Sequence, residues 1–216
     1  NLKTINDNCH SLGAKINRNL KYTSKYCDYA TLSFHPVKHI TSGEGGAVLT
    51  NDKKFDEKIK ILRSHGVIKN KFKEMWKYEM RTLGFNYRLS DINSALGLSQ
   101  LRKLSQFVKK RKEIAKVYDK SFKNIDGITT PKVKERYSHS YHLYPLKIDF
   151  KKFKVSKEIF FKKMKSKKIL LQVHYIPIHF QPFYKKKYGF KKKLLPVCEK
   201  FYLDEVSLPI YFTLKK

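Results

Sequence analysis

Acidic side chains are scarce in this sequence. Its 216 residues include 18 Asp and Glu against 48 Lys and Arg, which gives a formal net charge of +30. Such a charge can serve nucleic acid or an anionic membrane surface. The lysines are spread over the whole length, however, and abundant Lys, Ile, Asn, Phe and Tyr indicate a general bias of composition. Nucleic-acid binding is therefore the less favoured interpretation, although the positive field can concentrate a phosphate-bearing substrate.

Long apolar runs and paired cysteines are also missing. The sequence has no run of about eighteen apolar residues, so we expect no membrane span and no membrane partner, and we find no signal-peptide pattern. Its three cysteines, Cys9, Cys27 and Cys198, are scattered without CxxC spacing. This spacing argues against a disulfide framework and against a zinc site. We expect no metal, and we expect a reducing, cytoplasmic environment.

The length and the apolar content allow one large domain or two small ones, and no internal repeat is present. The first residue is Asn1 and not a methionine, and the opening apolar residues look like the end of a strand. We therefore expect a piece of a longer protein. A change of pattern near residue 125, marked by Asp126, Gly127 and Pro131, predicts a first domain over residues 1–124 and a second over residues 125–216.

The sequence from residue 31 to residue 46, TLSFHPVKHITSGEGG, predicts a strand, then a loop, then a second strand. Residues 31–35 are rich in β-branched and aromatic types, and Pro36 ends them. Glycines 43, 45 and 46 give backbone freedom before the apolar run at residues 47–50. The loop with its lysine is therefore expected at the end of a buried strand.

Lys38 lies in this loop, between two strand ends. Buried surface nearby favours the uncharged form of a lysine amine, which can attack a carbonyl and form a Schiff base. In so basic a chain, a lysine taken alone is most often a solvated surface charge. Asp7 follows an earlier apolar segment in the same way, and its carboxylate could pair with a protonated pyridine nitrogen. By itself, Asp7 also fits a turn-forming aspartate.

Helix signals divide the remainder of the first domain. Asp52 can cap a helix that ends at Gly66, and Ser90 can cap another that begins with Asp91. A long basic helix is expected over residues 98–124. In the loop before Ser90, an asparagine and an arginine, Asn86 and Arg88, offer an amide and a guanidinium that suit a phosphate. Local capping by the asparagine is the competing interpretation.

The second domain reads as a small α+β unit. We expect strands over residues 141–148 and 169–175, and helices over residues 155–167 and 193–206. His174 and Tyr175 close the second of these strands, and imidazole and phenol groups can bind phosphate and sugar hydroxyls. A His-Tyr pair on an edge strand has no such role in most proteins.

Four separated motifs together resemble the sugar-nucleotide aminotransferases of the DegT type, which are fold-type I pyridoxal-phosphate enzymes. They are NDNCH, SFHPVKHITSGEGG followed by LRSHG, GFNYR with its helix, and QVHYIP. The first departs from the family's EDxxH because Asn6 replaces a glutamate. The resemblance implies an α/β chain: the later part of a large domain with a mixed sheet and helices, followed by a small α+β domain.

Site residues follow from the same resemblance. Lys38 would carry pyridoxal 5'-phosphate covalently and act as acid and base, Asp7 would pair with the pyridinium, and His10 would lie near the ring. Ser33 would donate to the cofactor phosphate. Asn86 would reach the cofactor phosphate of the neighbouring subunit in a homodimer. Arg88, His174 and Tyr175 would bind the nucleotide-sugar.

The implied reaction is a transamination that takes an amino group from glutamate to a keto group on a nucleotide-linked sugar. The motifs look most like those of the branch that acts on UDP-4-keto-6-deoxy-hexosamines on the way to pseudaminic acid. The presence of Lys38 disfavours the related dehydratases, which have histidine there. Two alternatives stay open at this point: an inactive or split-gene fragment of such an enzyme, and a basic nucleic-acid-binding module.

Overall fold

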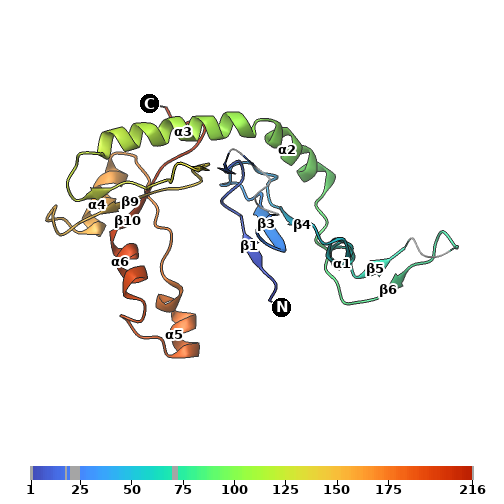
Figure 1. Ribbon diagram of the computed structural model, residues 1–216. Helices are drawn as coiled ribbons and strands as arrows, with labels where there is room; N and C mark the ends of the chain where they lie inside the picture. The colour runs from blue at the N-terminus through green and yellow to red at the C-terminus, as the bar shows by residue number, and fades with distance from the viewer. Residues whose placement is uncertain (1, 18, 20–24, 70–72, 216) are drawn as a thin grey trace. The chain divides into compact units, whose positions relative to one another are not determined.

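The computed structural model describes residues 2–17, 19, 25–69 and 73–215 of the chain (Figure 1). The chain forms two compact units. Unit 1 comprises Asn1–Gln106 and Glu135–Ser140, and unit 2 comprises Phe107–Lys134 and Tyr141–Lys216. A compact unit of this chain is not the same as a domain of a whole enzyme, so the domain boundary near residue 125 stays a prediction. None of the described helices is long and apolar enough to cross a membrane.

Unit 1 contains the mixed sheet that the sequence leads us to expect. Its three strands are β1 (Ile5–Asp7), β3 (Tyr29–Ser33) and β4 (Gly46–Thr50), in the order β1-β3-β4. β1 runs parallel to β3, with Asp7 opposite Thr31, and β4 runs antiparallel to β3. The expected strand at residues 31–35 therefore begins two residues earlier and ends two residues earlier.

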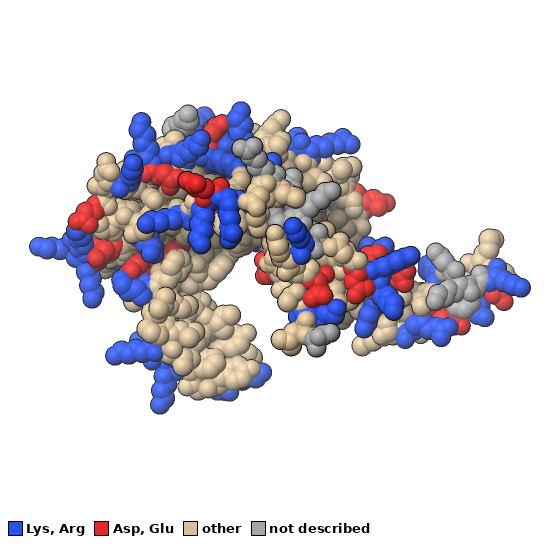
Figure 2. Space-filling view, in the orientation of Figure 1, with Lys and Arg blue, Asp and Glu red and all other residues tan. Residues whose placement is uncertain are grey.

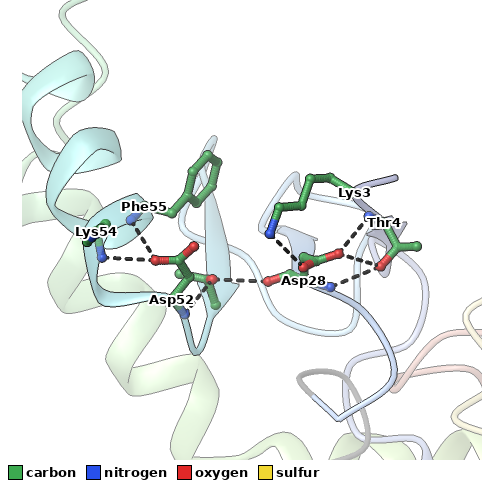
Figure 3. Close-up of polar contacts among 7 residues, drawn as sticks. Lys3, Thr4, Asp28, Asp52, Lys54 and Phe55 are labelled. Atoms are coloured by element: carbon green, nitrogen blue, oxygen red, sulfur yellow. Dashed lines mark hydrogen bonds and ion pairs between the residues drawn. The ribbon is translucent and has the colours of Figure 1, made fainter. Parts of the chain in front are cut away.

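The amino ends of β1 and β3 are joined through the carboxylate of Asp28 (Figure 3). Asp28 Oδ2 accepts hydrogen bonds from Thr4 N at 2.8 Å and Thr4 Oγ1 at 3.0 Å, and Asp28 Oδ1 pairs with Lys3 Nζ at 3.2 Å. The Thr50 hydroxyl donates to the Asp28 carbonyl at 3.0 Å, which ties in the end of β4. All three strands are thus fastened at this end of the sheet.

Both predicted N-caps of unit 1 are confirmed, whereas the first helix ends at Arg63 with Ser64 as its C-cap and not at Gly66. Helix α1 (Lys53–Arg63) begins after Asp52, whose carboxylate accepts from the N–H groups of Lys54 and Phe55 (Figure 3). Helix α2 (Asp91–Arg102) begins after Ser90, whose hydroxyl accepts from Asn93 N. Two short antiparallel pairs complete the unit: β2 (Lys15–Ile16) with β8 (Tyr137–Ser138), and β5 (Val67–Ile68) with β6 (Glu79–Met80).

The long helix expected over residues 98–124 is two helices. α2 ends at Arg102, and α3 (Leu104–Phe122) begins after a break at Lys103. The Lys103 N–H donates to the carbonyls of Gln100 and Leu101, which tightens the last turn of α2 to the three-residue spacing. Apolar periodicity runs through both helices, so the pattern alone gives no sign of this break.

Unit 2 is the expected α+β arrangement. Its antiparallel sheet has the order β10-β9-β7. The strands are β7 (Ile128–Thr129), β9 (Tyr144–Ile148) and β10 (Glu205–Leu208). The helical elements are α4 (Lys157–Ser166), the short 3-10 helix η2 (Ile178–Phe180), α5 (Pro182–Tyr188) and α6 (Pro196–Asp204).

The expected strand over residues 141–148 begins three residues later, at Tyr144, and two further expected elements of unit 2 are wrong in type or extent. Residues 169–175 are not a strand, because only Gln172 pairs, in a single bridge to Ser207. Two residues further on, the N–H of His174 donates to the carboxylate of Glu205 instead of continuing the ladder. The helix expected over residues 193–206 begins later, at Pro196, and ends at Asp204, and the chain then enters β10.

The core of unit 2 lies between α3 and the sheet. It is formed by nine buried apolar residues from α3, β9, β10 and the segments beside them: Ile114, Ala115, Tyr144, Leu146, Ile148, Leu171, Val206, Leu208 and Ile210. The buried Arg111 of α3 donates to the carbonyls of Tyr141, His142 and Ile210, which fastens the segments before β9 and after β10 to the helix. Burial lowers the pKa of Arg111, whose charge is satisfied by these carbonyls.

Candidate functional site

The carboxyl ends of β1 and β3 meet at one edge of the unit 1 sheet. Because the two strands are parallel, Asp7 at the end of β1 and Ser33 at the end of β3 lie at the same edge. The loop that holds Lys38 starts directly after β3. Three of the residues singled out from the sequence are therefore placed at one sheet edge, where open α/β sheets bind ligands.

Asp7 is exposed to solvent but is oriented by its neighbour Cys9. The Cys9 N–H donates to Asp7 Oδ1 at 3.0 Å. The Cys9 thiol and this N–H, as hydrogen-bond donors, lower the pKa of Asp7, and the charges of His10 and Lys38 lower it further. Asp7 is consequently held as a carboxylate, and the fields of His10 and Lys38 reach it.

The loop after β3 is tied to its own strand and to α2. Its Lys38 N–H donates to the His35 carbonyl at 2.9 Å, and Thr41 Oγ1 donates to the Phe34 carbonyl at 3.1 Å. Ser42 is fully buried, and its carbonyl accepts a hydrogen bond from the Asn93 side chain of α2. The backbone around Lys38 is thus fixed at both sides.

Gly45 allows this loop to close. Its φ of +151° is rarely adopted by residues with a side chain, and a Cβ there would lie 2.5 Å from Ser42 Oγ and 2.9 Å from Leu89 Cδ1. Phe34 N donates to the Gly45 carbonyl at 2.8 Å, so strand and turn come close together. The glycine-rich turn read from the sequence therefore has a steric basis.

Lys38 itself is half-buried, and no described residue accepts a hydrogen bond from its ammonium. Ser33 Oγ accepts from His35 N at 3.4 Å, and no acceptor for its own hydroxyl proton is found among the described residues. In the same loop, His35 Nε2 lies 3.7 Å from the carboxylate of Glu44. The amine and the hydroxyl are therefore available to a ligand.

Asn86 and Arg88 lie in the exposed loop before α2. Asn86 pairs with Ser64 in an isolated bridge, which joins this loop to the end of α1. The Arg88 side chain lines an open hollow of about 1230 Å³, together with residues from the end of α1, from β5 and from the adjoining Lys69 and Tyr78. Both residues are presented to solvent on the same short loop.

His174 belongs to unit 2 and is held by a buried polar chain. Its Nδ1 lies 2.7 Å from Ser207 Oγ, and Ser207 Oγ donates to Glu205 Oε1 at 2.5 Å. Glu205 is fully buried, and its Oε2 accepts from the backbone N–H of His174 at 3.0 Å. Because Ser207 donates to the carboxylate, its oxygen can accept from His174 Nδ1–H, which favours the tautomer with the proton on Nδ1.

Tyr175 follows His174 with its ring edge-on to the imidazole, at 4.6 Å between centroids, and its side chain is exposed. Arg88 and His174 belong to different compact units. Their joint action on a diphosphate stays a prediction.

Sequence reasoning missed three residues that orient the candidate site. Cys9 holds Asp7 in unit 1, and Glu205 with Ser207 holds His174 in unit 2. The spacing Asp-x-Cys at the end of a strand is a signal for an aspartate that accepts its neighbour's N–H. The spacing of residues 174 and 205 in the sequence does not predict their contact. Within the described part of the chain, no group of three His, Cys, Asp or Glu residues is arranged to hold a metal ion.

Comparison with known proteins identifies relatives along the whole chain. The family model described as "DegT/DnrJ/EryC1/StrS aminotransferase family" matches residues 1–216. A relative from Campylobacter jejuni, named UDP-4-amino-4,6-dideoxy-N-acetyl-beta-L-altrosamine transaminase, is 42% identical over 211 residues, which are 98% of this chain and 54% of the relative.

Solved structures give the same picture. Helicobacter pylori PseC, described as an aminotransferase involved in the biosynthesis of pseudoaminic acid, is 38% identical with a TM-score of 0.89, over 99% of this chain and 56% of that one. The putative sugar aminotransferase Spr1654 from Streptococcus pneumoniae, in its PLP form, is 25% identical with a TM-score of 0.87, over 99% of this chain and 54% of that one. The chain spans about half the length of the curated relatives it matches.

Proposed function

This chain belongs to the DegT/DnrJ/EryC1/StrS aminotransferase family, and from that premise we propose that the protein it is part of transfers an amino group to a keto-sugar. The sugar is carried on a nucleotide, and the cofactor is pyridoxal 5'-phosphate. Because the chain covers about half the length of its curated relatives, the activity is proposed for the whole protein.

The residues at the sheet edge fit the cofactor. Its ring nitrogen needs a carboxylate, and Asp7 is kept ionised by Cys9. Its phosphate needs hydroxyl and amide donors, which Ser33 and, from the neighbouring subunit of a homodimer, Asn86 can supply. Its aldehyde needs an amine, and Lys38 lies in a fixed loop beside them. When bound, the cofactor supplies an aldehyde and an electron-accepting ring.

In this assignment Lys38 has two tasks. Its Nζ would hold the cofactor in a covalent bond. When it is not engaged in that bond, the same Nζ would accept and return a proton as base and acid. His10 would be placed near the ring. The fixed backbone of the Lys38 loop keeps the amine within reach during both tasks.

The nucleotide-sugar is bound by Arg88, His174 and Tyr175. The guanidinium of Arg88 suits a diphosphate, because it offers planar, charged donors. His174, with Nδ1 engaged by Ser207, is presented in one orientation by a buried carboxylate chain. Tyr175 adds a hydroxyl that can bind the sugar.

The substrate we propose is a UDP-4-keto-6-deoxy-hexosamine on the way to pseudaminic acid, with glutamate as amino donor. The relatives from Campylobacter jejuni and Helicobacter pylori, which are named UDP-4-amino-4,6-dideoxy-N-acetyl-beta-L-altrosamine transaminases, support this sugar class. A cytoplasmic location is proposed with it, and the fact that none of the three cysteines forms a disulfide fits that compartment.

One observation carries the proposal: Asp7 and Ser33 end the parallel strands β1 and β3 at the same end of the unit 1 sheet, and the loop that holds Lys38 starts directly after β3. The test is to add pyridoxal phosphate to the chain, reduce with borohydride and locate the attached pyridoxyl group by mass spectrometry. We expect the group on Lys38. Lys38→Ala should lower total labelling on the order of tenfold or more, because Lys38 lies in the loop after β3, at the same end of the sheet as Asp7 and Ser33.

Lys54→Ala is the matched control, since Lys54 lies at the exposed start of α1. It should leave the labelling of Lys38 unchanged. Labelling spread evenly over Lys54, Lys38 and other surface lysines would contradict the assignment of Lys38.

A further inference from the structure

The segment from residue 178 to residue 198, here called the basic arm, carries six lysines and no acidic residue. Its lysines are Lys185, Lys186, Lys187, Lys191, Lys192 and Lys193. The whole chain has 18 acidic residues among 216, or about one in twelve, so the arm is distinguished by the acids it lacks. The positive charge of the arm is consequently uncompensated within the arm.

The acidic residues that follow the arm are already engaged. Glu199 accepts from His179 Nε2 at 3.0 Å and from the backbone N–H groups of Lys193 and Leu195. Asp204 pairs with Lys200 at 2.5 Å. These carboxylates therefore serve local structure and do not neutralise the lysines of α5.

Large apolar side chains are exposed on the same arm. Phe183 of α5 is 64% exposed, Ile178 of η2 63% and Val197 of α6 82%. Leu194 and Leu195 are half exposed as well. Figure 2 shows this arm at the lower left as a largely uncharged surface with lysines at its margin.

One lysine of the basic arm, Lys187, lies close to two of the arm's aromatic rings. Lys187 Nζ lies 5.8 Å from the centre of the Phe183 ring and 5.3 Å from that of Tyr188. Lysine stems can cover apolar surface while their ammonium groups stay in water. An apolar surface bordered by ammonium groups is typical of interfacial segments that lie on anionic lipid.

From these observations we propose that the basic arm docks on an anionic membrane surface. Phe183, Ile178 and Val197 would enter the boundary between headgroups and acyl chains, and the lysines would contact lipid phosphates. The positive charge of the arm favours an anionic lipid surface over a second copy of the same arm, because two such arms would repel each other.

Nucleic acid fits the arm less well than lipid. Bases stack on open aromatic faces. In the arm, Tyr184 stacks on Tyr188 and Tyr188 on Phe190, with interplanar angles of 16° and 24°, so these faces already contact one another. Among the large apolar residues of the arm, the most exposed is the aliphatic Val197, which suits hydrocarbon better than bases.

The experiment is cosedimentation of the chain with vesicles of phosphatidylcholine, with and without about one third phosphatidylglycerol. We expect binding only to the anionic vesicles, and loss of it near 1 M salt, where the Debye length is about 3 Å. Replacing Lys185, Lys186 and Lys187 together by Gln should weaken binding on the order of a hundredfold, at about fivefold for each lysine near the surface.

The matched control replaces three exposed lysines of α1, Lys53, Lys54 and Lys58, by Gln. It removes the same charge from unit 1, and we expect little change in vesicle binding. Phe183→Ala should weaken binding about tenfold without changing net charge. Circular dichroism checks that each variant is folded.

Three outcomes would overturn the proposal. One is equal loss of vesicle binding in the α5 and α1 triple variants, which would mean a general charge effect. Another is unchanged vesicle binding in Phe183→Ala. The third is a single-stranded DNA oligonucleotide that binds the chain more tightly than the vesicles do and loses this binding in the α5 variant, which would assign the arm to nucleic acid.

Discussion

The two ends of the unit 1 sheet use polar residues in different ways. At the amino end, the Asp28 carboxylate accepts from the Thr4 backbone, the Thr4 hydroxyl and the Lys3 ammonium, and Asp52 accepts from two N–H groups of α1. At the carboxyl end, Asp7 accepts from Cys9, while Lys38 Nζ and the Ser33 hydroxyl proton have no acceptor among the described residues. At the amino end, here called the closed end, these polar groups are hydrogen-bonded within the chain. At the carboxyl end, here called the open end, two donor groups have no acceptor among the described residues.

This difference separates structural from functional polar groups. A carboxylate whose acceptor positions are used by the chain mainly stabilises the fold. A half-buried amine beside a carboxylate, in a loop whose backbone is fixed, has capacity left for a ligand. Changes at the amino end should therefore act on stability, and changes at the carboxyl end should act on ligand binding unless they disturb the loop itself.

Gly45→Ala should have the largest effect on stability, because it disturbs the loop. The new Cβ would meet Ser42 Oγ at 2.5 Å in a backbone conformation that alanine rarely adopts. Backbone strain and the clash together should lower the free energy of unfolding by about 3 kcal/mol. Urea denaturation followed by circular dichroism measures this loss.

Gly189→Ala separates strain from the clash. Gly189 also has a positive φ, of +66°, but a Cβ there would meet nothing within 4 Å. Its cost should be the conformational term alone, about 1 kcal/mol. If both variants lost the same stability, the loop around Lys38 would not be closely packed on Ser42 and Leu89.

The sequence was sufficient to predict the parts of the fold that depend on local signals. The caps Asp52 and Ser90 are confirmed, and so are β3 and β4 around the glycine-rich turn. Each follows from side chains that bond to their own neighbouring backbone, or from a short apolar run between turn residues. Such signals lie within a few positions of the residues they affect.

The parts that the sequence could not predict depend on contacts distant in the chain. Gln172 meets Ser207, and His174 meets Glu205, across more than thirty residues, and these contacts replace the strand expected over residues 169–175. The same holds for the candidate site. Lys38 and Ser33 were singled out through their motif. The hydrogen bonds that join His174 to Ser207 and Glu205 connect residues more than thirty positions apart, and no local pattern in the sequence predicts them.

Asp28, at the closed end of the sheet, should make the stability of the protein depend on pH. The Thr4 N–H, the Thr4 hydroxyl and Lys3 hold the pKa of Asp28 below its ordinary value of 3.8. A carboxylate with a depressed pKa contributes stability that is fully present above the unfolded pKa and is lost as the pH falls through the folded pKa. Wild type should therefore lose more stability than Asp28→Asn between about pH 5 and pH 2, as measured by thermal unfolding.

Glu57→Gln provides the control, since this exposed α1 residue has no hydrogen-bond or ion-pair partner among the described residues. Its unfolding should follow the pH dependence of wild type. A profile for Asp28→Asn that coincides with those of wild type and Glu57→Gln would show that the Asp28 contacts do not stabilise the sheet.

Asp7→Asn should have the smallest effect on stability. The amide oxygen can still accept from Cys9 N–H, so the free energy of unfolding should stay within about 0.5 kcal/mol of wild type. An amide cannot keep a pyridine nitrogen protonated, however, so retention of pyridoxal phosphate should weaken on the order of tenfold. Asp28→Asn should show the converse, with altered stability and unaltered cofactor retention. If Asp7→Asn retained the cofactor as wild type does, the carboxylate of Asp7 would not be the partner of the pyridine nitrogen, and the assignment of the cofactor to the open end of the sheet would be overturned.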